Sequence, residues 1–238
     1  MSIIFRQLFD EQSSTLTYLL ADAQSGDAVL IDTVAEHSAM YLGLLRELDL
    51  NLVYLLETHA HADHVTGAGV LREHTNARTA TGHRTGVMCA DVLLADGDTL
   101  VFGDEVLRVI ATPGHTPGCV SYRWRNCLFT GDALLIGGCG RTDFQGGDAG
   151  ALYDSITQRL FTLPDETLVY PAHDYKGMRV SSIAQEKLTN ARVPGRSRQA
   201  FIDLMQSLDL PRPRLIDQAV PANLRCGLPA GPLDIHAS

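Results

Sequence analysis

Residues 58–64 read Thr58-His59-Ala60-His61-Ala62-Asp63-His64, with three histidines and one aspartate inside six consecutive positions. The preceding residues, 51–56, form an apolar run with the composition of a strand, and residues 65–73 can begin a helix. The stretch therefore lies on a strand-to-helix loop, where α/β proteins gather ligand-type residues at the carboxyl ends of strands. Imidazoles and a carboxylate at this density predict a metal site.

Three further apolar segments each lead to a residue that can bind metal. The segment 106–110 is followed by His115, the segment 127–130 by Asp132, and the segment 167–170 by His173. These residues are too far apart in the sequence for a zinc finger. Such distances are what a site assembled from several strand ends of a sheet requires, and we expect an α/β fold that brings the four ends together.

Composition restricts the possible partners. The chain has 238 residues and a formal net charge of −9 at pH 7. An acidic chain is a poor partner for nucleic acid or for an anionic membrane surface, since both require a basic face. No apolar run approaches the roughly 18 residues that a membrane span needs. The first residues resemble neither a secretory signal nor a transit peptide, so we expect a cytoplasmic protein.

Five cysteines, without any CxxC pair, predict reduced thiols rather than a disulfide framework. Cys139 and Cys226 are accordingly expected to be small packed thiols. Residues 1–178 are expected to form the core, with residues 179–238 as an extension packed on it within a single domain. In this extension Phe201, Leu204, Met205 and Leu208 have the spacing of an amphipathic helix that packs on the core.

The residues alone leave two kinds of metal centre open. If every ligand-type residue binds, the site holds two metals that activate a bridging water for hydrolysis. If two histidines and one aspartate bind, they form a facial triad, which leaves three positions open and suits non-haem iron(II) with dioxygen.

Several motifs resemble those of the metallo-β-lactamase superfamily, which has an αββα sandwich. Within it, the chain is similar to the persulfide dioxygenase (sulfur dioxygenase) family, the group that includes the mitochondrial ethylmalonic-encephalopathy protein. The resemblance runs nearly from end to end and rests on residues 58–67, 113–120, 129–136, 138–144, 170–175 and 219–227. Glyoxalase II, a hydrolase of the same superfamily, has a different C-terminal region.

The resemblance implies one iron(II) per chain, bound by His59, His115 and Asp132. It implies that four other residues orient these ligands and shape a polar pocket; they are His61, Asp63, His64 and His173. Arg141 is then the candidate for holding a glutathione carboxylate through a bidentate fork, and Tyr175 the candidate for a hydrogen bond near the substrate.

The implied reaction converts glutathione persulfide, dioxygen and water to glutathione and sulfite, as part of sulfide oxidation. The alternative is a dinuclear thioester hydrolase of the glyoxalase II type. Candidate protein partners are a second copy of the chain, in a homodimer, and a separate rhodanese-type sulfurtransferase.

Overall fold

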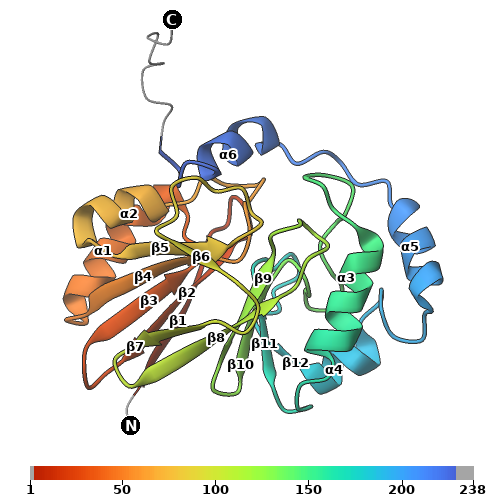
Figure 1. Cartoon of the computed structure of the whole chain (residues 1–238), viewed down its shortest axis with the longest axis horizontal. Helices are drawn as coiled ribbons and strands as arrows, with labels where there is room; N and C mark the ends of the chain where they lie inside the picture. The colour runs from red at the N-terminus through yellow and green to blue at the C-terminus, as the bar shows by residue number, and fades with distance from the viewer. Residues whose placement is uncertain (1–2, 229–238) are drawn as a thin grey trace, which may run out of the picture.

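The computed structural model describes residues 3–228. Residues 1–2, at the start of the expected core, and residues 229–238, at the end of the expected extension, lie outside the described residues. Two six-stranded sheets pack face to face, with helices on their outer faces (Figure 1). This is the expected αββα sandwich.

The first sheet is built from the first part of the chain, and its strands follow one another in sequence order. β1 and β2 are antiparallel, as are β2 and β3, whereas β3 to β6 run parallel. Helices α1 and α2 lie on the outer face (Figure 1). The elements are β1 (Ile3–Phe9), β2 (Leu16–Asp22), β3 (Asp27–Ile31), a 3₁₀ turn η1 (Ala35–His37), α1 (Ser38–Glu47), β4 (Asn51–Glu57), α2 (Ala68–Thr75), β5 (Arg78–Gly82) and β6 (Val92–Leu94).

The second sheet has the order β12-β11-β10-β9-β8-β7. It is antiparallel except for the parallel pair β10 and β11. As expected, β9 and β10 form a hairpin around Arg125 and Asn126. The elements are β7 (Thr99–Phe102), β8 (Glu105–Ala111), β9 (Val120–Trp124), β10 (Cys127–Gly131), α3 (Ala149–Ser155), a π-helical segment η2 (Ile156–Leu160), β11 (Leu168–Pro171), β12 (Ser181–Ser182), α4 (Ile183–Thr189), α5 (Arg198–Gln206) and α6 (Ile216–Asn223).

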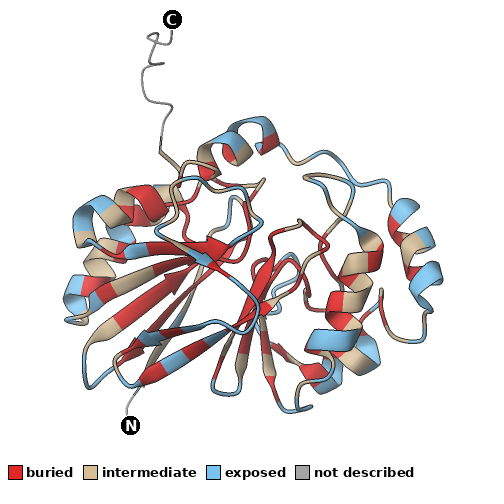
Figure 2. Cartoon of the chain, in the orientation of Figure 1, coloured by how far each residue is buried: buried red, intermediate tan, exposed pale blue. Residues whose placement is uncertain are grey.

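Strand β2 shows how the sequence produces the layers. All seven of its residues are buried (Figure 2). Leu16, Tyr18 and Leu20 belong to the apolar cluster between the two sheets. Leu19 and Ala21, which alternate with them, belong to the cluster under α1 and α2. Because successive side chains of a strand point to opposite faces, this mostly apolar strand contributes to both layers.

The predicted amphipathic helix is α5, and it packs on the core as expected. Phe201 is fully buried, and its ring lies 5.5 Å from that of Tyr153 in α3. Met205 joins the same apolar cluster beneath the second sheet. The helix begins at the cap residue Ser197, whose hydroxyl accepts a hydrogen bond from the Ala200 N–H.

The expectation that all cysteines are reduced thiols is wrong. Cys89, in the loop after β5, forms a disulfide with Cys226, which lies just beyond α6. The partners are 137 residues apart in sequence, so no local spacing reveals the pair. Cys139 is a buried free thiol, as expected, whereas Cys226 is not. Within residues 3–228, no helix combines the length and the apolar character needed to cross a membrane.

Candidate metal centre

The structure brings His59, His115 and Asp132 together at one edge of the sandwich. One ligand atom from each residue lies within 4.8 Å of the other two. His59 follows β4 of the first sheet, His115 lies in the loop between β8 and β9, and Asp132 follows β10. The cluster is therefore assembled where the two sheets meet, as the strand-end pattern predicts.

Hydrogen bonds fix the orientation of both imidazoles. His115 Nδ1 lies 2.7 Å from the carbonyl oxygen of Arg141, which can only accept, so Nδ1 carries the proton. The Thr58 hydroxyl donates to Asp32 and can accept from His59 Nδ1, which is 2.9 Å away. In both rings the Nε2 lone pair is left for a metal, the arrangement that metal-binding histidines commonly show.

The ionisation of these residues suits metal binding. Burial, together with the neighbouring imidazoles of His61 and His115, holds the pKa of His59 well below its usual value and keeps this ring neutral. Burial alone raises the pKa of Asp132, but the charge of the His173 imidazole and its hydrogen bond to the carboxylate outweigh burial and lower that pKa well below the usual range. The cluster thus offers two histidines and one carboxylate, which fits a facial-triad metal site.

Gly131 allows Asp132 to come close to the loop that carries His59. Its φ of +53° is in the left-handed region. A Cβ atom there would lie 2.6 Å from the Thr58 hydroxyl oxygen, closer than real contacts allow. Glycine is therefore needed for both the backbone turn and the close packing of the two strand ends.

A second group, formed by His61, Asp63 and His173, lies beside the first and could also hold a metal ion. Most of its ligand atoms already contact other side chains. His173 Nδ1 lies 2.6 Å from Asp132, and its Nε2 lies 2.9 Å from Asp63. The same Asp63 oxygen lies 3.0 Å from His64 Nδ1 and 3.1 Å from the Thr15 hydroxyl, which donates to it.

Two carboxylates contact the imidazole of His61. Its Nε2 lies 3.1 Å from Asp32 and 3.3 Å from Glu57. Burial opposes protonation of this ring, but Asp32 and Glu57 outweigh it and raise the pKa of His61 to about 10. Among the described residues, His61 Nδ1 and His64 Nε2 are buried without a hydrogen-bond partner. These two nitrogens are the feature that would fit a second metal.

A cavity of about 840 Å³ opens onto the ligand cluster. His115, Asp132, His173 and Asp63 line its floor. Its walls carry four cationic side chains and Tyr175; the cations are Arg141, Lys176, Arg192 and Arg214. The cavity is large enough for a tripeptide-sized ligand. Its four cations outnumber the three carboxylates that line it, Asp63, Asp132 and Asp174, which favours an anionic ligand.

The structure places both predicted substrate-binding residues in this cavity, but Arg141 already has partners. Its guanidinium forms a bidentate pair with Asp143 and donates to the carbonyl oxygens of Leu210 and Pro211. Tyr175 is 66% exposed, and its ring stacks on that of His173 with a centroid distance of 5.6 Å. A substrate carboxylate at Arg141 would therefore have to share the guanidinium with Asp143.

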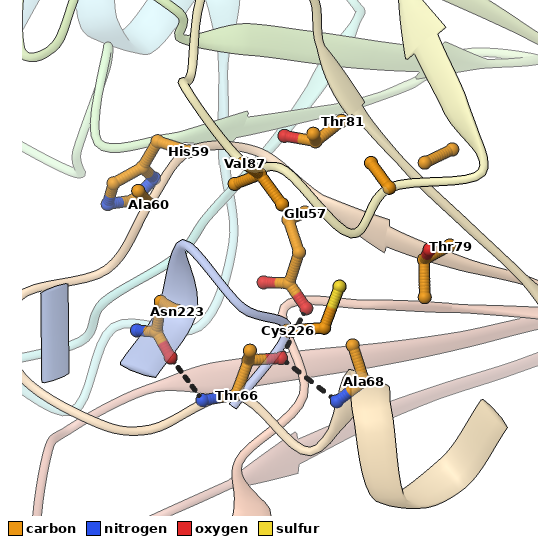
Figure 3. Close-up of a pocket in the computed structure, with 12 residues that line it drawn as sticks. Glu57, His59, Ala60, Thr66, Ala68, Thr79, Thr81, Val87, Asn223 and Cys226 are labelled. Carbon is orange, nitrogen blue, oxygen red and sulfur yellow. Dashed lines mark hydrogen bonds between the residues drawn. The ribbon is translucent and has the colours of Figure 1, made fainter. Parts of the chain in front are cut away.

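Sequence reasoning missed three residues that support the loop of residues 58–67 between β4 and α2, called the metal loop below. Asp32 ends the apolar run of β3, so the strand-end pattern could have found it. Glu57 ends β4 and accepts a hydrogen bond of 2.5 Å from the Thr66 hydroxyl, beside a cavity of about 10 Å³, the size of one water molecule (Figure 3). Asn223 lies in residues 219–227, which contribute to the resemblance, but nothing in that stretch indicates which residues Asn223 contacts.

Comparisons with known proteins agree with this geometry. Residues 11–173 match the model of the metallo-β-lactamase superfamily. The chain belongs to this superfamily. It is 48% identical over 228 residues to the Homo sapiens protein named "Persulfide dioxygenase ETHE1, mitochondrial", covering 95% of this chain and 89% of the human one. The Mus musculus protein of the same name is 47% identical over 232 residues, covering 97% and 91%.

A solved structure extends the match. The crystal structure of ETHE1 from Myxococcus xanthus superposes with a TM-score of 0.93 at 56% sequence identity, covering 94% of this chain and all of the other. Within the superfamily, the chain therefore belongs to the persulfide dioxygenase family, and it is an enzyme of the dioxygenase kind.

Proposed function

We propose that this protein is a persulfide dioxygenase that uses one iron(II) per chain, bound by His59, His115 and Asp132. The reaction takes glutathione persulfide, dioxygen and water to glutathione and sulfite, which balances in atoms and electrons. When bound, iron(II) supplies the redox and Lewis-acid chemistry that joins dioxygen to the outer sulfur. The names and coverage of the relatives support the reaction class.

One observation carries the choice of ligands. His59 and His115 each use Nδ1 in a hydrogen bond to the protein, which leaves both Nε2 atoms for a metal, and His115 Nε2 lies 3.6 Å from Asp132 Oδ2. Asp63 and His173, by contrast, already form hydrogen bonds with one another and with neighbouring side chains. The first group is therefore the better prepared to bind a metal, while the second holds it in place.

The cavity supports an anionic tripeptide substrate. Glutathione persulfide carries two carboxylates and an acidic persulfide. We propose that Arg141 binds one carboxylate, exchanging part of its contact with Asp143, and that Lys176, Arg192 and Arg214 add to the positive field. Tyr175, stacked on His173, is placed to donate its hydroxyl to the substrate.

A second candidate function is a dinuclear thioester hydrolase of the glyoxalase II type. The unpaired His61 Nδ1 and His64 Nε2 are the observation in its favour, because a second metal would take up such nitrogens.

Metal analysis of protein purified without oxygen distinguishes the two functions. We expect about one iron per chain, oxygen uptake with glutathione persulfide, and no cleavage of S-lactoylglutathione when oxygen is absent. Two zinc ions per chain together with anaerobic thioester cleavage would establish the hydrolase instead. Zinc-reconstituted protein is the control, since it should bind substrate without oxygen uptake.

A cytoplasmic location, a homodimer and a separate rhodanese-type sulfurtransferase partner complete the proposal. Light scattering coupled to gel filtration tests the dimer, and cell fractionation tests the location. Faster sulfite formation when a sulfurtransferase supplies the persulfide would support the partner.

A further inference from the structure

Asn223, the last residue of α6, reaches back to the metal loop from the far end of the described chain. Its side chain is buried. The amide nitrogen donates to the carbonyl oxygens of His61 and His64, at 2.9 and 2.8 Å. The amide oxygen accepts from the Thr66 N–H at 2.8 Å (Figure 3). All three hydrogen bonds go to the backbone of one loop.

The backbone groups that the loop presents to α6 match the hydrogen-bonding groups of an amide side chain. The loop presents two acceptors and one donor to α6, and an Asn side chain offers two donors and one acceptor. An Asp carboxylate would face two carbonyl oxygens with no proton to give, and an aliphatic side chain would leave three buried polar groups unpaired. The match between Asn223 and the loop is therefore specific in both number and kind of hydrogen bond.

This part of the loop is outside any helix or strand, so it depends on such contacts for its shape. Gln145 donates to the Ala60 carbonyl oxygen at 2.8 Å, and the Ala35 N–H donates to the Val65 carbonyl oxygen at 2.8 Å, so Asn223 supplies the contacts between these two points. The positions of the His61 and His64 carbonyls determine where the intervening Asp63 points. Asp63 in turn holds His173, which holds the ligand Asp132.

The last described residues are anchored without help from Asn223. The Gly69 N–H donates to the Cys226 carbonyl oxygen at 2.8 Å, and Cys226 is joined to Cys89. Gly227, at a φ of +77°, packs so closely that an added Cβ would lie 1.9 Å from the Thr66 carbonyl oxygen. Loss of the Asn223 amide would therefore release the loop while leaving α6 in its place.

We infer that Asn223 is a positioning residue that holds the backbone of residues 61–66 in the shape needed for tight metal binding. The inference rests on the proposed metal centre and names a part of it that lies outside the substrate cavity. Asn223 does not line that cavity, so it acts on metal affinity and leaves substrate affinity unchanged.

The test compares Asn223→Ala with Ala219→Gly. Ala219 is buried on the same helix, and because its methyl group makes no hydrogen bond, glycine there weakens α6 without removing a polar contact to the loop. Fe(II) alone is titrated without oxygen against a chelator, and thermal unfolding of the metal-free proteins is recorded. We expect Asn223→Ala to raise the Kd for Fe(II) by about 5- to 10-fold, because it acts on the ligand Asp132 only through Asp63 and His173, the side chains that orient it. KM for glutathione persulfide in the iron-loaded fraction should stay within about twofold of the parent value.

Ala219→Gly should keep the parent Kd within about twofold despite a lower midpoint of thermal unfolding. Equal weakening in the two variants, or an unchanged Kd in Asn223→Ala, would overturn the inference. If Asn223→Ala does not fold, amide hydrogen exchange of the parent decides. The Thr66 N–H should be protected with and without metal, whereas protection only in the presence of metal contradicts the inference. The parent's Fe(II) binding and oxygen uptake test the proposed function separately.

Discussion

Asp132 and His173 lie at the ends of the neighbouring parallel strands β10 and β11, and a hydrogen bond of 2.6 Å joins Asp132 Oδ1 to His173 Nδ1. The other carboxylate oxygen, Oδ2, lies 3.6 Å from His115 Nε2. His173 therefore takes one oxygen of the carboxylate and leaves the other directed at the histidine cluster. This division of the carboxylate suits a ligand that binds metal through one oxygen.

The first prediction separates a one-metal from a two-metal centre. Asp132→Asn should weaken Fe(II) binding by about 100-fold or more and abolish oxygen uptake, because it removes the carboxylate of the triad. Asp63→Asn, its matched control, should still hold close to one iron per chain, with affinity lowered by about tenfold at most. Metal analysis and chelator competition measure both. Equal loss of metal in the two variants would contradict the single-iron assignment.

The second prediction concerns Arg141. Arg141→Met should raise KM for glutathione persulfide about 10- to 100-fold, the value of one charge-assisted hydrogen bond, with iron content unchanged. Asp143→Asn is the control, because it breaks the same internal pair but keeps the cation. Its KM should be equal to or below that of the parent. A KM raised to the same extent in both variants would assign Arg141 a purely structural role.

The third prediction tests the disulfide. Cys89→Ser should lower the free energy of unfolding by about 2–5 kcal/mol, because the bond closes a long loop in the unfolded chain. Cys127→Ser, which removes a half-buried free thiol, should change it by less than about 1 kcal/mol. Urea unfolding without reductant measures the difference. In excess dithiothreitol the parent and Cys89→Ser should converge, and a difference that persists there would argue against the bond as its source.

The fourth prediction is a pH dependence far from the metal site. Hydrogen bonds from Arg125 lower the pKa of Glu105 below its usual value near 4.5, although burial alone would raise it. A hydrogen bond of 2.7 Å from Trp124 Nε1 lowers this pKa further. A lowered pKa contributes stability that is complete above the unfolded value and is lost as the pH falls through the folded one. Glu105→Gln should therefore cost about 1–3 kcal/mol at pH 7, since Arg125 is partly exposed, and progressively less below about pH 4.5.

Urea unfolding from pH 3 to pH 7 measures this loss. The exposed carboxylate of Glu166 supplies the control, and Glu166→Gln should change stability by less than about 0.5 kcal/mol throughout. A Glu105→Gln penalty that is constant with pH would show that packing, not charge, is responsible.

Local patterns in the sequence predicted much of this protein. Apolar runs such as the one in β2 identify strands, and the polar residues that follow them identify the site, because the carboxyl ends of parallel strands meet at one edge. His59, His115, Asp132 and His173 follow from this rule, and their meeting is what the structure contains. Asp32 obeys the same rule and could have been included.

The contacts from the last part of the described chain could not be predicted in this way. Asn223 binds a loop 157 to 162 residues earlier, and Cys226 pairs with Cys89 across 137 residues. Such contacts depend on how α6 docks, which no periodicity records. Arg141 is a different case. The sequence identifies it as a cation that could bind a carboxylate, but does not show that its guanidinium already pairs with Asp143.

The distance in sequence between Asn223 and the loop it holds has a consequence for the newly made protein. Ribosomes make the residues of the metal motif early and Asn223 more than 150 residues later. A nascent chain that already displays His59 and Asp132 therefore still lacks the contact that shapes the loop. Under the proposed function, tight loading with iron therefore requires that synthesis has passed Asn223, long after the histidine-rich motif has been made.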